Sequence, residues 1–215
     1  MEIVSGPLKN ARGRHENMII YQVGDKTYAR QVPSYDGNKD SETRTIQNTR
    51  MSSVVTLYQS IKGTFAEIAW RVEARRLLLK SGYNYFVKTN LNAYSNNYTV
   101  GDFALLFMTV GQLQIPFNLR RQESPVGTLA LTWEVSPWMG KRREKDRLGI
   151  AVIYDNEPFR VEFIESTGIT RQEGEATLQF GRPGASAAHV YCFFMNETQS
   201  EFTNSMYFNV STEQI

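Results

Sequence analysis

Cysteine and histidine are scarce in this 215-residue chain, which has one cysteine and two histidines. The single thiol, Cys192, excludes an intrachain disulfide. His189 precedes it by three residues on an expected strand, where side chains three positions apart face opposite sides. We therefore expect no catalytic Cys–His pair from these two residues. The other histidine, His15, lies in a glycine-punctuated segment near the N-terminus.

The sequence also lacks the short motifs that carry common chemistry. It contains no Gly-x-Ser-x-Gly, no Gly-x-x-x-x-Gly-Lys phosphate loop and no dinucleotide-binding glycine pattern. No group of cysteine, histidine and acidic residues has the spacing of a metal site. Because catalysis needs converging titratable groups, we predict that the protein is not an enzyme and has no cofactor and no metal.

Long hydrophobic runs are missing as well. The longest apolar stretch, Phe103 to Val110, has the length of a strand and falls short of the ~18 residues of a membrane-spanning helix. The N-terminus lacks a basic segment followed by an apolar one, so it does not read as a secretory signal. We expect a soluble protein that is made in the cytoplasm and has no membrane partner.

Charge is unevenly distributed, although the net charge is only +2. Residues 1–125 carry 16 Lys and Arg against 10 Asp and Glu, which gives +6, and residues 126–215 carry 8 against 12, which gives −4. A basic half and an acidic half can complement each other between copies of a chain. The same difference also fits two unrelated solvated surfaces.

The first 32 residues, called the arm here, indicate a β-hairpin. Residues 18–23 are β-prone, residues 24–26 are turn-forming, and residues 27–32 alternate in polarity. A lone hairpin is marginally stable in water, so the arm must lie on another surface. That surface belongs either to its own domain or to a neighbouring copy.

A long amphipathic helix is expected from Thr45 to about Lys80, with Thr45 as its cap and Ser81-Gly82 as its stop. Gly63 interrupts the pattern and indicates a kink or a close contact. The apolar face recurs every three or four residues. It comprises Met51, Val54, Val55, Tyr58, Ile61, Phe65, Ile68, Ala69 and Val72.

The rest of the chain changes from helical to β-prone. A short helix from Tyr83, a buried strand over 102–115 and a linker between Pro116 and Pro125 are expected first. Short strands separated by turns follow, which is typical of an immunoglobulin- or fibronectin-like antiparallel β-sandwich with Trp133 in its core. The prediction is thus an α+β protein with an arm and helical region at 1–125 and a β-sandwich at 126–215. The expected strands are 128–135, 148–154, 159–165, 176–180, 189–195 and 205–210.

Two basic segments are candidate partner-binding sites. In the arm, tyrosines stand between cations, an arrangement that suits another protein, a phosphate or a single-stranded nucleic acid. The second segment is an expected loop over 140–147, which also contains Glu144 and Asp146, and the pI of 8.6 is low for a dedicated nucleic-acid binder. The candidates are Arg12, Arg14, Tyr21, Tyr28 and Arg30 in the arm and Lys141, Arg142 and Arg143 in the loop.

The order of arm, helix and β-rich domain resembles a family of roughly 200-residue proteins of unknown function from Bacteroidota bacteria and their phages. The resemblance covers nearly the whole chain, but the arm has fewer glycines than is usual and the Lys141–Arg147 segment is extra. It implies the layout and a phage association, and it implies no reaction. The matching positions are Gly6, Gly13, Gly24, Tyr28, Arg30, Pro33, Thr45, Gln47, Arg50, Trp133 and 204–207 (Asn-Ser-Met-Tyr).

Together these patterns favour a structural protein of a phage particle that docks through its arm on copies of itself or on other structural proteins. Its location would be the virion, or the cytoplasm if the chain is not encoded by a phage. A cytoplasmic nucleic-acid-binding module that uses the basic arm is the main alternative. A carbohydrate-binding sandwich with Trp138, Tyr154 and Phe159 as an exposed stacking platform is a further one.

Overall fold

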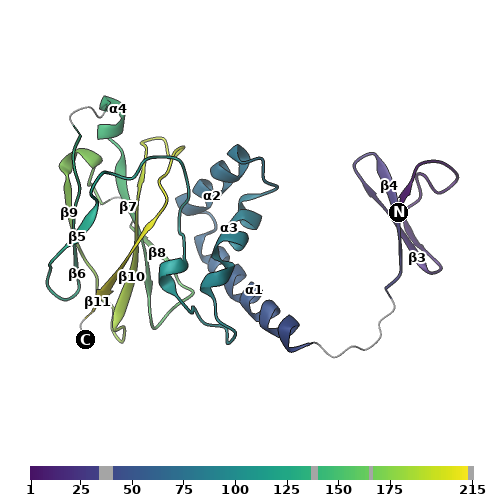
Figure 1. The fold of residues 1–215 in the computed structure, drawn as a ribbon, viewed down its shortest axis with the longest axis horizontal. Helices are drawn as coiled ribbons and strands as arrows, with labels where there is room; N and C mark the ends of the chain where they lie inside the picture. Colours follow the sequence, from purple (N-terminus) through teal and green to yellow (C-terminus); the bar gives the residue numbers. More distant parts are fainter. Residues whose placement is uncertain (34–40, 137–139, 165–166, 213–215) are drawn as a thin grey trace. The chain divides into compact units, whose positions relative to one another are not determined.

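The structure is a computed structural model of the chain (Figure 1). Helices and several antiparallel sheets are present, so the expected α+β class is confirmed. Contacts divide the chain into two compact units, Met1–Ser41 and Glu42–Ile215. The residues described are 1–33, 41–136, 140–164 and 167–212.

The first unit is a small antiparallel sheet of four strands in the order β1-β4-β3-β2. The hairpin expected at residues 18–32 is present as β3 and β4, and Gly24 between them takes a φ of 60°, which glycine adopts without strain. The two outer strands were not predicted, because they are only two and three residues long. The strands are β1 Glu2–Ile3, β2 Gly13–His15, β3 Met18–Val23 and β4 Lys26–Gln31.

The single helix expected from Thr45 to Lys80 is wrong, because the chain forms two helices there, α1 Glu42–Ile61 and α2 Phe65–Arg76. The break lies at Gly63, whose φ of 81° is outside the helical region. The helix begins before Thr45, so this residue is not its cap. Ser81 starts the next helix instead of stopping this one. That helix is α3 Gly82–Asn90, where the Ser81 hydroxyl accepts the Asn84 N–H at 3.1 Å.

Residues 102–115 do not form the buried strand that was expected. From Leu106 to Val110 the side chains are buried or half-buried, but two of the amides there bond to side chains of other segments rather than to a neighbouring strand. The Phe107 N–H donates to Asn90 Oδ1 at 2.7 Å, and the Met108 N–H donates to Ser205 Oγ at 3.0 Å. The apolar run therefore indicated burial correctly from Leu106 onward and the type of backbone pairing incorrectly.

Two antiparallel sheets form the rest of the second unit, with strand orders β11-β10-β7-β8 and β5-β6-β9. All six strands expected after residue 127 are present, with bounds that are shifted, shortened or lengthened by a few residues. Strand β5 lies in the segment that was expected to be a linker. The strands are β5 Arg120–Gln122, β6 Thr128–Thr132, β7 Arg147–Tyr154, β8 Glu162–Ile164, β9 Glu175–Gln179, β10 Ala187–Met195 and β11 Met206–Ser211.

Four short helical segments complete the elements of the second unit. Three are single turns of 3-10 helix, which connect longer elements. The fourth lies in the basic segment that was expected to be a loop. They are η1 Leu91–Ala93, η2 Phe103–Leu105, α4 Lys141–Glu144 and η3 Arg171–Glu173.

Strand β10 lies between two hydrophobic cores, so both of its faces are buried (Figure 1). Tyr191 and Phe193 belong to the core shared with helices α1–α3, whereas Cys192 and Phe194 belong to the core shared with the β5-β6-β9 sheet. Trp133, expected as a core anchor, packs edge-on against Phe194 with ring centroids 5.3 Å apart.

The helices before residue 126 therefore share a core with the sheets after it. Contacts divide the chain between Ser41 and Glu42, and the domain boundary expected at residues 125 and 126 stays a prediction. His189 and Cys192 lie at positions of opposite parity on β10, as the sequence indicated. Burial raises the pKa of the Cys192 thiol and lowers the pKa of His189, so both side chains favour their neutral forms.

Candidate docking surface

The arm sheet has one covered face. Ile20 and Ala29 are paired across β3 and β4, and both are buried. Thr27 is buried on the same face, where its hydroxyl donates to the carbonyl of Lys9. The segment that precedes β2 therefore contacts this face of the sheet.

The opposite face of the arm sheet is open within its unit. Tyr21 pairs with Tyr28, and their rings stack with centroids 5.8 Å apart and an interplanar angle of 25°. Ile19 pairs with Arg14 on one side and with Arg30 on the other, which places two cations in the next row of the same face. The Arg30 guanidinium lies 5.9 Å from the centre of the Tyr21 ring, within the range of a cation–π contact.

Four of the five arm candidates thus lie on one face, and we call the residues Arg14, Tyr21, Tyr28 and Arg30 the arm face. Arg12 is not part of it. Its Nε donates to Gln22 Oε1 at 2.8 Å, and Gln22 alternates with Tyr21 along β3, so it lies on the covered side.

Sequence reasoning missed two apolar residues that lie beside the arm face. Ile19 and Val23 have the same parity as Tyr21 on β3, and Val23 is 61% exposed. Strand alternation alone could have found them, since residues i and i+2 of a strand share a face. They make the arm face more apolar than the basic and tyrosine candidates suggested.

The arm unit buries too few side chains for a hydrophobic core alone to keep it folded. Of its described side chains, Ile20, Thr27 and Ala29 are buried. Units below about 40 residues normally need disulfides, metals or association with another surface, and the lone cysteine of this chain lies elsewhere. Burial of the arm face against a partner would supply the missing apolar contact area.

The second candidate segment is more structured than the expected loop, because it contains α4. Lys141 is exposed, and the side chain of Arg142 lies outside the described part of the chain. Arg143 is half-buried, with Nη1 2.6 Å from Glu201 Oε2 and 3.9 Å from Asp146 Oδ2. These ion pairs give Arg143 a role inside the fold, whereas Lys141 stays available to a partner.

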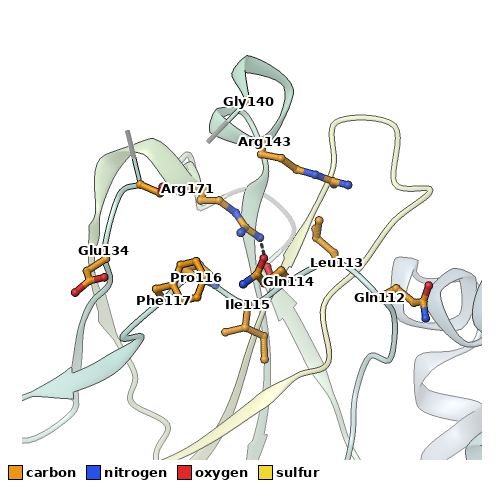
Figure 2. Close-up of a pocket in the computed structure, with 11 residues that line it drawn as sticks. Gln112, Leu113, Gln114, Ile115, Pro116, Phe117, Glu134, Gly140, Arg143 and Arg171 are labelled. Atoms are coloured by element: carbon orange, nitrogen blue, oxygen red, sulfur yellow. Dashed lines mark hydrogen bonds between the residues drawn. The ribbon is translucent and has the colours of Figure 1, made fainter. Parts of the chain in front are cut away.

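A cavity of about 400 Å³ lies beside Arg143 (Figure 2). Segment 112–117 lines it, with Phe117 57% exposed. Arg171 donates to the Gln114 carbonyl at 2.6 Å and lies 3.4 Å from Asp146 Oδ2, so a buried ion pair holds this wall of the cavity. Its apolar residues and its exposed acid, Glu134, suit an apolar side chain with a cation beside it.

The stacking platform considered for carbohydrate binding is wrong, because Tyr154 is buried with only 6% of its surface exposed. Phe159 is half-buried and packs against Tyr94 and Tyr98, with ring centroids 6.3 and 4.9 Å away. Trp138 lies outside the described residues.

The described residues offer no metal site. They contain no group of three or more His, Cys, Asp or Glu side chains that could hold a metal ion. No helix in that part of the chain is long and apolar enough to cross a membrane.

Comparison with known proteins does not assign this chain to a family. A scan against models of protein families finds no match to this chain, and no curated protein matches its sequence. The resemblance to the Bacteroidota and phage family, which depends on short motifs, therefore stays a prediction.

Proposed function

We propose that this is a non-enzymatic structural protein of a phage particle, in its capsid, neck or tail, that docks on its neighbours through the arm. The observation that carries the proposal is the arm face. It combines stacked tyrosines, two arginines and neighbouring apolar residues on a unit with a very small core of its own. Tyrosine and arginine are, with tryptophan, the residues that most often anchor protein interfaces.

The edges of the arm sheet offer a second means of attachment. Strands β1 and β2 are its outer strands, and among the described residues they pair on one side only, with β4 and β3 respectively. An edge strand presents unpaired backbone groups that can extend the sheet of a neighbour. In the proposed assembly, strand pairing would give the arm its register and burial of the arm face would contribute most of the stability.

The β-rich part supports the finer assignment of an immunoglobulin- or fibronectin-like sandwich. If β5 to β11 are named A, B, C, C′, E, F and G in chain order, the two sheets are A-B-E and G-F-C-C′. Immunoglobulin-like domains likewise place G, F and C in one sheet and A, B and E in the other. We propose that this sandwich is the rigid body that presents the arm to its partners.

A double substitution of the tyrosines, Tyr21→Ser with Tyr28→Ser, tests the proposal. We expect the variant to remain folded and to lose about 2–4 kcal/mol of docking free energy, because two aromatic anchors are removed. The measurement is the size distribution of the complexes formed by the full chain, by sedimentation velocity. Arg12→Ala is the matched control, since Arg12 lies off the arm face, and an equal loss in that variant would contradict the proposal.

Nucleic-acid binding is the second candidate function, and the arm face also supports it. Stacked tyrosines with flanking arginines can bind successive bases and phosphates of a single strand. Salt distinguishes the two functions, because binding through several phosphates weakens steeply as salt concentration rises. A gel shift that is absent even at low salt would leave protein docking as the role of the arm.

A further inference from the structure

Three consecutive leucines form an exposed corner at the end of α2, and we call Leu77, Leu78 and Leu79 the leucine corner. Their exposed fractions are 40%, 94% and 40%. The Leu78 N–H donates to the Arg75 carbonyl at 3.1 Å, and the Leu79 N–H donates to the Ala74 carbonyl at 2.8 Å. These two bonds define the Schellman motif that ends many helices.

Leu78 occupies the position of this motif that is normally glycine. Its φ is 54°, in the left-handed region that residues with a Cβ atom adopt only with strain. Because the side chain is almost fully exposed, no packing within the chain offsets that strain. The stability of the fold alone would favour glycine here, so the leucine is better explained by a contact outside the fold.

The charges around the leucine corner indicate what it would contact. Arg75 and Lys80 flank it, and both are exposed. Among the described residues neither of them forms an ion pair. A complementary partner therefore has an apolar hollow with a carboxylate at its edge.

The chain itself contains a hollow with an apolar wall and a carboxylate beside it, which is the cavity of Figure 2, and the rest of its lining is polar. Leu113, Ile115 and Phe117 supply its apolar lining, and its volume of about 400 Å³ can accept a leucine side chain. Glu134 also lines it and is exposed. The cations inside the cavity, Arg143 and Arg171, have acidic neighbours of their own.

We propose that the leucine corner of one copy inserts Leu78 into this cavity of a second copy, with Arg75 and Lys80 facing Glu134. Two different surfaces would meet, so the contact is heterologous and joins copies head to tail. Both surfaces lie in Glu42–Ile215, so this contact is independent of the arm. Loss of one contact leaves the other unaffected.

Two charge substitutions, Leu78→Asp and Phe117→Asp, test the two surfaces separately in the full chain that also carries Tyr21→Ser and Tyr28→Ser, which removes docking through the arm. Sedimentation velocity over a range of concentrations should show association of this arm variant, weakened about tenfold or more by either further substitution. Leu105→Asp is the matched control, since Leu105 is 49% exposed and belongs to neither surface. An equal mixture of the two variants should form a complex of two chains and no larger one, because the mixture retains one intact pair of surfaces.

Leu78→Gly distinguishes an effect on association from an effect on stability. We expect the melting temperature of this variant to be about 2–4 °C higher, because the backbone strain is relieved. Its association should nevertheless be about tenfold weaker, because the leucine side chain is lost. The proposal is overturned if the arm variant does not associate, if Leu105→Asp has the same effect, or if the mixed variants stay monomeric. The arm variant with Tyr21→Ser and Tyr28→Ser should keep this contact, so failure here leaves docking through the arm untouched.

Discussion

Removal of residues 1–32 is expected to leave a folded, soluble protein that no longer forms full-size complexes. All residues of both hydrophobic cores lie between Val54 and Val210, so the truncation removes none of them. It does remove the arm face and the two edge strands of the arm sheet. The chain should therefore keep its melting temperature within about 2 °C, a change that corresponds to less than about 1 kcal/mol for a protein of this size.

Light scattering and circular dichroism of the truncated chain check this expectation together. Unchanged circular dichroism bands of the helices and sheets would show that the remaining unit is folded. Weak head-to-tail pairing through the leucine corner can persist, but the largest complexes should disappear. Full-size complexes formed by the truncated chain would contradict docking through the arm.

Trp70→Ala should be strongly destabilising. Trp70 is fully buried in the helical core, its Nε1–H donates to the Met108 carbonyl at 2.9 Å, and its ring packs edge-on against Tyr85 and Phe86. Truncation of a buried tryptophan creates a large cavity and typically lowers the free energy of unfolding by about 3–5 kcal/mol. The Met108 carbonyl also loses its hydrogen-bond donor, which lowers the free energy of unfolding further.

Urea unfolding measures this change, and Trp70→Phe provides the matched control. Phenylalanine retains much of the apolar volume and removes the N–H group, so we expect a loss of about 1–3 kcal/mol. A loss below about 1 kcal/mol for Trp70→Ala would show that this core is not packed as described.

Trp70 also shows why the helical region was only partly predictable. The sequence was interpreted as one helix with a continuous apolar face that included Ile68 and Val72. Because the helix breaks at Gly63 and restarts after Thr64, the buried face of α2 is rotated. Phe65 and Ala69 of the expected face are buried, whereas Ile68 and Val72 are half-buried. Trp70 and Ala74, which were not expected on that face, are fully buried. The helical periodicity carried past Gly63 therefore predicted only part of the buried face.

The β-rich part was predictable because its strands are regular. Turn signals and apolar alternation located six strands, and the placement of Trp133 in the core was correct. Strand β5 was not predicted, because Arg120–Gln122 is exposed and polar and shows no apolar alternation. Its pairing with β6 depends on backbone hydrogen bonds, which no side-chain pattern reveals.

The candidate site was predictable as a set of residue types and only partly as a geometry. Alternation along β3 and β4 places Tyr21 and Tyr28 on one face, and the structure adds that Arg14 joins them through a strand too short to predict. The role of Arg143 in the fold depends on Glu201, which is distant in sequence. Sequence spacing could not have paired them.

Hydroxyl-radical footprinting of the arm tests docking through the arm face most directly. It compares the full chain in its complexes with the same chain dissociated by dilution. Tyr21 and Tyr28 should become protected in the complexes, because a partner would cover the arm face. Met18 has the parity of Ile20 on β3 and is 38% exposed, so it provides an internal control on the other face. Protection of Met18 with unchanged labelling of both tyrosines would contradict the account.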